Sequence, residues 1–108
     1  MSKRITIRPR ASQDIDKHYD FISQENPDAA LRFFDAVRVT IAQIARMPGI
    51  GNLYPVRQPH LQGIRKWAVK GFRKYLIFYF DRDEAVDVVR ILYASQDIAS
   101  ILDKDAGS

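Results

Sequence analysis

The chain has 108 residues, of which 46% are hydrophobic and 28% charged, and its formal net charge is +4. This length accommodates one globular domain, 1–108, with an expected ordered core over about residues 3–103, and excludes a second domain. The absence of cysteine excludes disulfides and thiolate metal sites. The sequence shows no signal peptide, and no apolar run approaches the roughly 20 residues of a membrane span. We therefore expect a cytoplasmic protein with no membrane partner.

The first expected element is a short strand over residues 3–8, where polar and apolar residues alternate up to Pro9. A helix follows, with Ser12 as its expected N-cap. Its apolar stripe has helical spacing and consists of Ile15, Tyr19 and Ile22.

A second helix is predicted to begin at Asn26-Pro27-Asp28, which combines a cap residue, a proline at the first helical position and an acid in the first turn. Met47-Pro48-Gly49 ends it. Its apolar stripe comprises Ala30, Phe33, Phe34, Val37, Ile41 and Ile44. The two helices form a predicted hairpin whose stripes face the core.

A loop over residues 48–63 precedes three strand-like runs, 64–70, 75–80 and 86–93. Short turns join these runs, so consecutive strands are expected to be antiparallel. A short helix is expected within 96–102, after which the end of the chain is expected to fray. The order strand, helix, helix, three strands predicts a two-layer α+β fold with a three-stranded antiparallel meander.

Both faces of the strand 75–80 are apolar, because Tyr75, Ile77 and Tyr79 alternate with three further apolar residues. Helices on one side leave the other face of the sheet in need of cover. The tail helix is expected to cover a small part of that face and a partner protein the larger part.

Charge is distributed unevenly, because no acidic residue occurs between Asp35 and Asp81. The interval contains eight cations: Arg38, Arg46, Arg57, Arg65, Lys66, Lys70, Arg73 and Lys74. Such a stretch predicts a positive surface that suits either phosphates or an acidic protein.

Residues that could carry catalysis are scarce. His18 and His60 lack paired carboxylates at metal-ligand spacing, so neither a metal nor another cofactor is expected. Metal-free RNA cleavage needs a base, cations at the phosphorane and an acid, and the cationic hairpin supplies only the cations. This leaves protein binding favoured over catalysis, with RNA cleavage as an open alternative.

Six stretches together carry a family resemblance over about residues 4–103: ASQDI (11–15), NPDAA (26–30), MPGIG (47–51), GIRKWAV (63–69), YLIFY (75–79) and VRILYASQDI (89–98). In this order and at these intervals the chain resembles the RelE/ParE superfamily of type II toxin–antitoxin toxins, and within it the ParE branch. The resemblance implies the RelE/ParE-like toxin fold: a strand, a helical hairpin, three strands and a short helix.

For the ParE branch, the resemblance implies a non-enzymatic inhibitor of DNA gyrase, held inactive in a hetero-oligomer by a cognate ParD-like antitoxin with an acidic C-terminal segment. No direct sequence-specific DNA binding is implied. The alternative is a RelE-like, ribosome-dependent mRNA endonuclease. The segment 93–97 counts against it, because this segment carries no basic residue and no tyrosine follows it. Of the frequent ParE ending His-Gly-x-Arg-Asp only Asp97 is kept, since Tyr93, Ala94 and Gln96 stand at the other fixed places.

The residues expected to bind the target or the antitoxin combine cations with aromatic anchors, the side chains that dominate protein interfaces. They are Arg65, Lys66, Trp67, Lys70, Arg73, Lys74, Tyr75, Tyr79, Arg90 and Tyr93. A groove beside Phe33, Phe34 and Val37 is a further candidate seat for an antitoxin helix, with core packing as the alternative role of these side chains.

Overall fold

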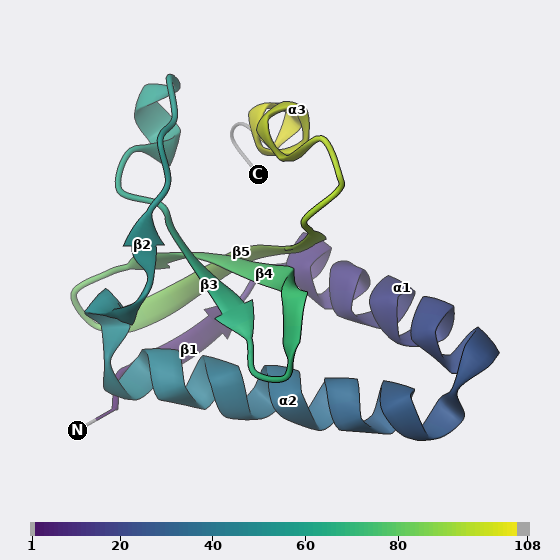
Figure 1. The fold of residues 1–108 in the computed structure, drawn as a ribbon. Coiled ribbons are helices and arrows are strands. Elements are labelled where there is room, and N and C mark those ends of the chain that lie inside the picture. Colours follow the sequence, from purple (N-terminus) through teal and green to yellow (C-terminus); the bar gives the residue numbers. More distant parts are fainter. Residues whose placement is uncertain (1, 106–108) are drawn as a thin grey trace.

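The computed structural model describes residues 2–105, so the expected fraying falls partly on residues 106–108, which lie outside the described residues. The chain forms a mixed five-stranded sheet packed against a helical hairpin (Figure 1). The elements are β1 (Arg4–Ile7), α1 (Pro9–Glu25), α2 (Pro27–Arg46), the 3₁₀ turn η1 (Pro48–Ile50), β2 (Asn52–Leu53), the 3₁₀ turn η2 (Pro59–Leu61), β3 (Arg65–Val69), β4 (Phe72–Asp81), β5 (Ala85–Tyr93) and α3 (Ile98–Lys104). The predicted α+β class is confirmed.

A proline determines where α1 begins, and a proline with an N-cap side chain determines where α2 begins. Pro9 occupies the first turn of α1 and Arg8 the N-cap, so the expected N-cap at Ser12 is wrong: the fixed φ of proline suits the first helical position, and the helix begins before Ser12. At the second helix the prediction is confirmed, because the Asn26 side chain accepts a hydrogen bond from the Ala29 N–H at 3.0 Å.

The sheet has the order β1-β5-β4-β3-β2. The meander β3-β4-β5 is antiparallel as predicted, and β1 adds to it in parallel, with Ile5 opposite Val86. The two-residue strand β2 was not predicted; it pairs with the start of β3, with Asn52 opposite Lys66. These pairings make β1 and β2 the outer strands, so both edges of the sheet are formed by short strands.

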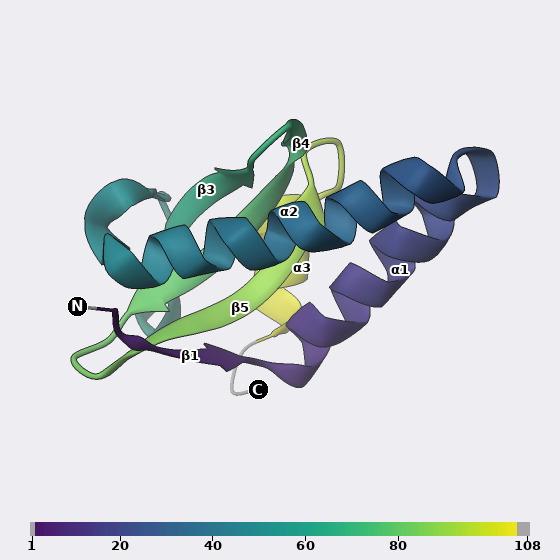
Figure 2. The same cartoon turned by 90° about the horizontal axis from the view of Figure 1, so that it is seen from below.

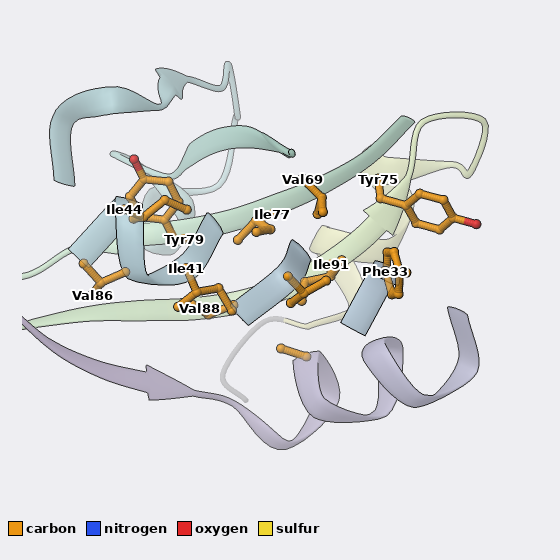
Figure 3. Close-up of a cluster of buried hydrophobic side chains, with 12 residues drawn as sticks. Phe33, Ile41, Ile44, Val69, Tyr75, Ile77, Tyr79, Val86, Val88 and Ile91 are labelled. Atoms are coloured by element: carbon orange, nitrogen blue, oxygen red, sulfur yellow. The ribbon is translucent and has the colours of Figure 1, made fainter. Parts of the chain in front are cut away.

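One face of the sheet packs on α1 and α2, which lie side by side beneath it (Figure 2). Figure 3 shows the core on this side, with Tyr79 at one end of the cluster and Phe33 and Tyr75 at the other. All three side chains are buried. The apolar stripe of α2 is therefore largely core, as the helical spacing predicted.

The opposite face is covered by the chain itself. Leu61 from η2 and Leu102 from α3 pack against Phe78 and Phe80 of β4 and leave each of them 5% exposed or less. Figure 1 shows α3 and the segment around η2 on the side of the sheet away from α1 and α2. The expectation that a partner must cover most of this face is therefore wrong, because the long loop and the tail helix together bury it.

Side chains of α1 complete the edge of β5 beyond the end of β1. The last paired residues of the two strands are Ile7 and Val88, so Ile91, which pairs with β4 on its other side, has no strand beside it on the β1 side. The Asp14 carboxylate accepts the Ile91 N–H at 3.0 Å, and His18 Nε2 lies 2.8 Å from the Ile91 carbonyl oxygen. His18 is thus half-buried and structural, rather than a surface histidine.

Candidate functional site

The β3–β4 hairpin positions three exposed cations, Lys70, Arg73 and Lys74. The turn uses Gly71, whose φ of +80° is a conformation that residues with a Cβ rarely adopt. The Lys70 N–H donates to the Thr40 hydroxyl at 3.0 Å, which fixes the end of the hairpin against α2. The cations therefore project from an anchored turn.

Beside this hairpin lies a groove of about 640 Å³ between β3 and α2. Four cations line it, and the described residues of its lining include no acidic side chain. Its apolar surface comes from both elements, because Val39 of α2 is 55% exposed and Trp67 of β3 is half-buried. The cations are Arg46, Lys66, Lys70 and Arg73. We call this feature the β3 groove; its charge is entirely positive.

Three of the expected residues on β3 are partly held by intramolecular contacts. Arg65 Nη1 donates to the Gly51 carbonyl oxygen at 2.6 Å and so ties β3 to the segment before β2. Lys66 Nζ lies 5.7 Å from the centre of the Tyr54 ring, a cation–π distance. Trp67 packs against the core on the helix side. Lys66 and Trp67 nevertheless line the β3 groove, whereas Arg65 does not.

Tyr75 and Tyr93 belong to a different site. Their rings lie 4.9 Å apart, and His18 lies 4.9 Å from Tyr75 on the helix side. Burial and, to a lesser extent, the neighbouring Tyr93 raise the pKa of Tyr75 above its usual value of 10.0. These residues line a hollow of about 460 Å³ together with Gln96, and none of them lines the β3 groove.

Two of the expected interface residues have internal roles instead. Tyr79 is 0% exposed, and its hydroxyl donates to the Pro48 carbonyl oxygen at 2.7 Å and accepts the Gly51 N–H at 2.9 Å. Burial, as the largest cause, raises its pKa above the usual 10.0. The alternation along β4 correctly predicted that Tyr79 and Tyr75 lie on the same face of the strand. The helices cover that face, so Tyr79 is buried and its hydroxyl binds the loop at Pro48 and Gly51 instead of a partner.

Arg90 is the second such residue. Its guanidinium binds Asp14 with two hydrogen bonds, Nε to Oδ2 at 2.7 Å and Nη2 to Oδ1 at 2.8 Å, and binds Asp105 through Nη1 at 2.9 Å. The Arg90 side chain is 13% exposed. The two carboxylates, with the hydrogen bonds to Asp14 as the largest cause, raise its pKa further above the usual range. Arg90 thus joins α1, β5 and the end of α3. It also lines the hollow beside Tyr75 and Tyr93, where its charge is already paired with the two carboxylates.

The expected groove beside Phe34 is only partly present. Phe33 and Val37 are buried core residues, whereas Phe34 is 44% exposed. Phe34 lines a hollow of about 360 Å³ with Ile5 and Ile7 of β1. The ten expected site residues therefore do not form one site, and the hollow beside Phe34 is separate from all of them. The largest group of the ten lines the β3 groove and comprises Lys66, Trp67, Lys70 and Arg73.

The sequence did not identify the contribution of α2 to the β3 groove. Val39, Gln43 and Arg46 line it, and their spacing of four and three residues places them on one helix face. This face of α2 indicates a binding groove only when α2 is known to lie beside the cationic hairpin. That adjacency is a property of the tertiary structure.

Within the part of the chain that the structure describes, no helix is long and apolar enough to cross a membrane. Nor do the described residues gather three or more histidine or acidic side chains in a way that would hold a metal ion.

Comparison with known proteins gives a family and several related structures, of which two are described. The family described as "ParE toxin of type II toxin-antitoxin system, parDE" matches residues 5–98. A chain of the "Chromosomal ParDE TA system from P. aeruginosa" has a TM-score of 0.70 at 16% identity, over 87% of this chain and 98% of that chain. A chain of the "YoeB-YefM complex from Staphylococcus aureus" has a TM-score of 0.53 at 16% identity, over 86% and 98%. No curated protein sequence matches. At these identities the two structures show a shared fold.

Proposed function

Because the chain belongs to the ParE toxin family of type II toxin–antitoxin systems, we propose that this toxin inhibits DNA gyrase and is neutralised by a cognate antitoxin of ParD type. The proposal places the toxin in the cytoplasm, where gyrase acts. The β3 groove is the observation that supports a protein partner, since its four cations and its apolar surface fit an acidic, amphipathic segment.

The chemistry of the β3 groove favours binding over RNA cleavage. Its cations resemble those that stabilise a phosphorane, but its described lining includes no histidine, tyrosine or carboxylate to move a proton. His18 and Tyr75 lie in the separate hollow on the helix side. A groove with cations and apolar surface but no acid–base pair suits a protein that grips its target.

The first test is inducible expression of the chain in bacteria without an antitoxin. We expect growth arrest, and we expect the purified protein to inhibit supercoiling by gyrase while transcripts stay intact. Ribosome-dependent cleavage of mRNA, with gyrase unaffected, would instead identify the RelE-like activity. Continued growth despite normal expression would refute both activities.

A matched pair of variants tests the role of the β3 groove. Lys70→Glu/Arg73→Glu reverses two exposed groove cations, and Lys17→Glu/Arg32→Glu reverses two exposed cations elsewhere, on α1 and α2. Both variants change the net charge equally. We expect the groove variant alone to lose affinity for the co-expressed antitoxin, measured by co-purification. Equal losses in both variants would show that only overall charge matters.

A further inference from the structure

The strand β1 forms one margin of the sheet, and two of its residues direct their backbone groups away from the sheet (Figure 2). The N–H groups of Arg4 and Arg8 donate to carbonyl oxygens on the β5 side, at 3.2 and 3.0 Å. Alternate residues of a parallel strand bond the same neighbour, so Ile5 and Ile7 point outward. Within residues 2–105 the N–H and C=O groups of these two isoleucines have no hydrogen-bond partner.

This open stretch of backbone has a definite end on each side. Lys3 also points outward, but its N–H already donates to the Ala45 carbonyl oxygen of α2 at 3.0 Å. Pro9, which follows β1, has no N–H. The open edge therefore consists of Ile5 and Ile7 and offers one donor and one acceptor at each.

The side chains at this edge are apolar and exposed. Ile5 is 43% exposed, Ile7 41% and Phe34 44%, and all three line the hollow of about 360 Å³ between β1 and the helices. Native proteins usually protect an edge strand with charge or cover it, because an exposed apolar edge pairs with another chain. The β1 edge thus has both the backbone and the side chains of an interface.

The charges around β1 are balanced. The three cations at this strand are each paired with an acid at the far end of β4 or on the way into β5. The pairs are Lys3–Asp81 at 2.6 Å, Arg4–Glu84 at 3.3 Å and Arg8–Asp87 at 2.9 Å. The described lining of the hollow has one acid and one base, Asp16 and Arg38. Unlike the β3 groove, this edge therefore does not select an anionic ligand, and it does not repel a second copy of itself.

A second copy satisfies this edge in one antiparallel register. When Thr6 lies opposite Thr6 of the second copy, Ile5 of each copy lies opposite Ile7 of the other. Both pairs then exchange N–H and C=O groups, which gives two hydrogen bonds for each pair. Lys3 lies opposite Pro9, and neither has an outward N–H to donate, so the pairing ends at the same place on both strands. A shift by two residues in either direction places an isoleucine opposite Lys3 or Pro9 and loses this match.

The side chains also match themselves in this register. Ile5 and Ile7 of the two copies meet on the helix side, and the two Thr6 side chains meet on the other side. Pairs of β-branched residues and pairs of threonines both stabilise neighbouring strands. Arg4 lies opposite Arg8 of the second copy, and because each already has its own carboxylate, two ion pairs meet there rather than two uncompensated charges.

We propose that two copies of this chain associate through their β1 edges, antiparallel and centred on Thr6, so that their sheets join into one continuous sheet. The contact is isologous, because each copy contributes the same surface. This inference does not depend on the proposed function, since the β3 groove lies toward the opposite edge of the sheet. Both β3 grooves remain accessible in the dimer and lie toward its two ends.

The first test measures the mass of the purified chain by sedimentation velocity over about 1–300 μM. The contact is small, so we expect a dissociation constant of about 10–100 μM. Ile5→Lys/Ile7→Lys places charge on the exposed apolar edge and should weaken the dimer more than about tenfold. Met47→Lys/Leu53→Lys is the matched control, because it adds the same charge at two other exposed apolar residues and should change the dissociation constant by less than about twofold.

A cross-link tests the register. The chain has no cysteine, so Thr6→Cys introduces a single thiol. Directly opposed residues that are not hydrogen-bonded have Cα atoms about 4.5 Å apart, which a disulfide can span. Under mild oxidation we expect Thr6→Cys to form covalent dimers at least about fivefold faster than Leu53→Cys on β2, which lies at the other edge of the sheet. Equal rates for the two variants would contradict a contact centred on Thr6.

A third measurement uses the wild-type chain and so does not depend on any variant folding. Hydrogen exchange followed by NMR should slow at the Ile5 and Ile7 amides as the protein concentration rises. A chain that stays monomeric up to about 300 μM, or a dimer that Ile5→Lys/Ile7→Lys leaves intact, would overturn the proposal. Protection of these amides only when a different chain is added would assign the edge to that chain instead. Gyrase inhibition and growth arrest are measured separately, so a monomeric chain that inhibits gyrase refutes the dimer and leaves the proposed function in place.

Discussion

The substitution Tyr79→Phe tests whether the Tyr79 hydroxyl stabilises the fold or contributes to binding a partner. The Tyr79 hydroxyl is buried and serves two backbone groups at once, donating to the Pro48 carbonyl oxygen and accepting the Gly51 N–H. A Cβ at Gly51 would lie 2.6 Å from that hydroxyl, so the loop approaches the ring as closely as glycine permits. Removing the hydroxyl leaves a buried donor and a buried acceptor without this partner.

The expected cost follows from these two bonds. A net contribution of about 1 kcal/mol for each hydrogen bond, increased by the desolvation of partners left without one, gives a loss of about 2–3 kcal/mol in the free energy of unfolding. A domain of this size has roughly 5–15 kcal/mol in total. The variant should therefore fold, but with a clearly lower stability.

Urea denaturation followed by circular dichroism measures this loss. Tyr19→Phe serves as control, because Tyr19 is half-buried on α1 and its hydroxyl makes no hydrogen bond within residues 2–105; its stability should change by less than about 0.5 kcal/mol. Folded Tyr79→Phe protein should bind the antitoxin as tightly as wild type. A stability equal to wild type, or a folded variant with weakened antitoxin binding, would refute the assignment of Tyr79 to an internal role.

Three further predictions concern stability. Arg90→Met removes the cation from the buried carboxylate of Asp14 and one of the cations paired with Asp105, which keeps Arg10 at 3.3 Å, and should cost about 3–5 kcal/mol in urea denaturation; a smaller cost than 1 kcal/mol would contradict a buried ion-pair network. Leu102→Ala should cost roughly 2–5 kcal/mol and expose α3 to proteolysis, whereas unchanged stability would show that α3 does not bury the sheet. Burial raises the pKa of Tyr75, so the unfolded state ionises first: the resulting stability is complete below pH 10 and is lost as the pH rises through the folded-state pKa. Tyr75→Phe should therefore lose less stability than wild type between neutral and alkaline pH, and an identical pH dependence would argue against the burial of this hydroxyl.

Local patterns were sufficient to predict the three α-helices and every strand except β2. Asn26 and the following proline define the start of α2, and the alternation along β4 correctly indicated two apolar faces. Such features depend on neighbours along the chain, whose spacing the sequence states directly. The family resemblance, carried by stretches of the same kind, is confirmed by the match over residues 5–98.

Contacts between distant residues were not predictable in the same way. Arg90 looked like a surface cation because its partner Asp14 lies 76 residues away, and Tyr79 looked like an interface anchor because Pro48 lies 31 residues away. Whether a polar side chain binds a partner or a buried group depends on which elements become neighbours. That information is absent from local spacing.

The sequence by itself thus determined the three α-helices and every strand except β2, the two-sided apolar strand and the positive charge between Asp35 and Asp81. The tertiary structure decided that α3 and the long loop cover the second face, and that α2 and β3 bring four of those cations around one groove. The physical reason is that hydrophobic periodicity shows which residues need burial but not which element buries them.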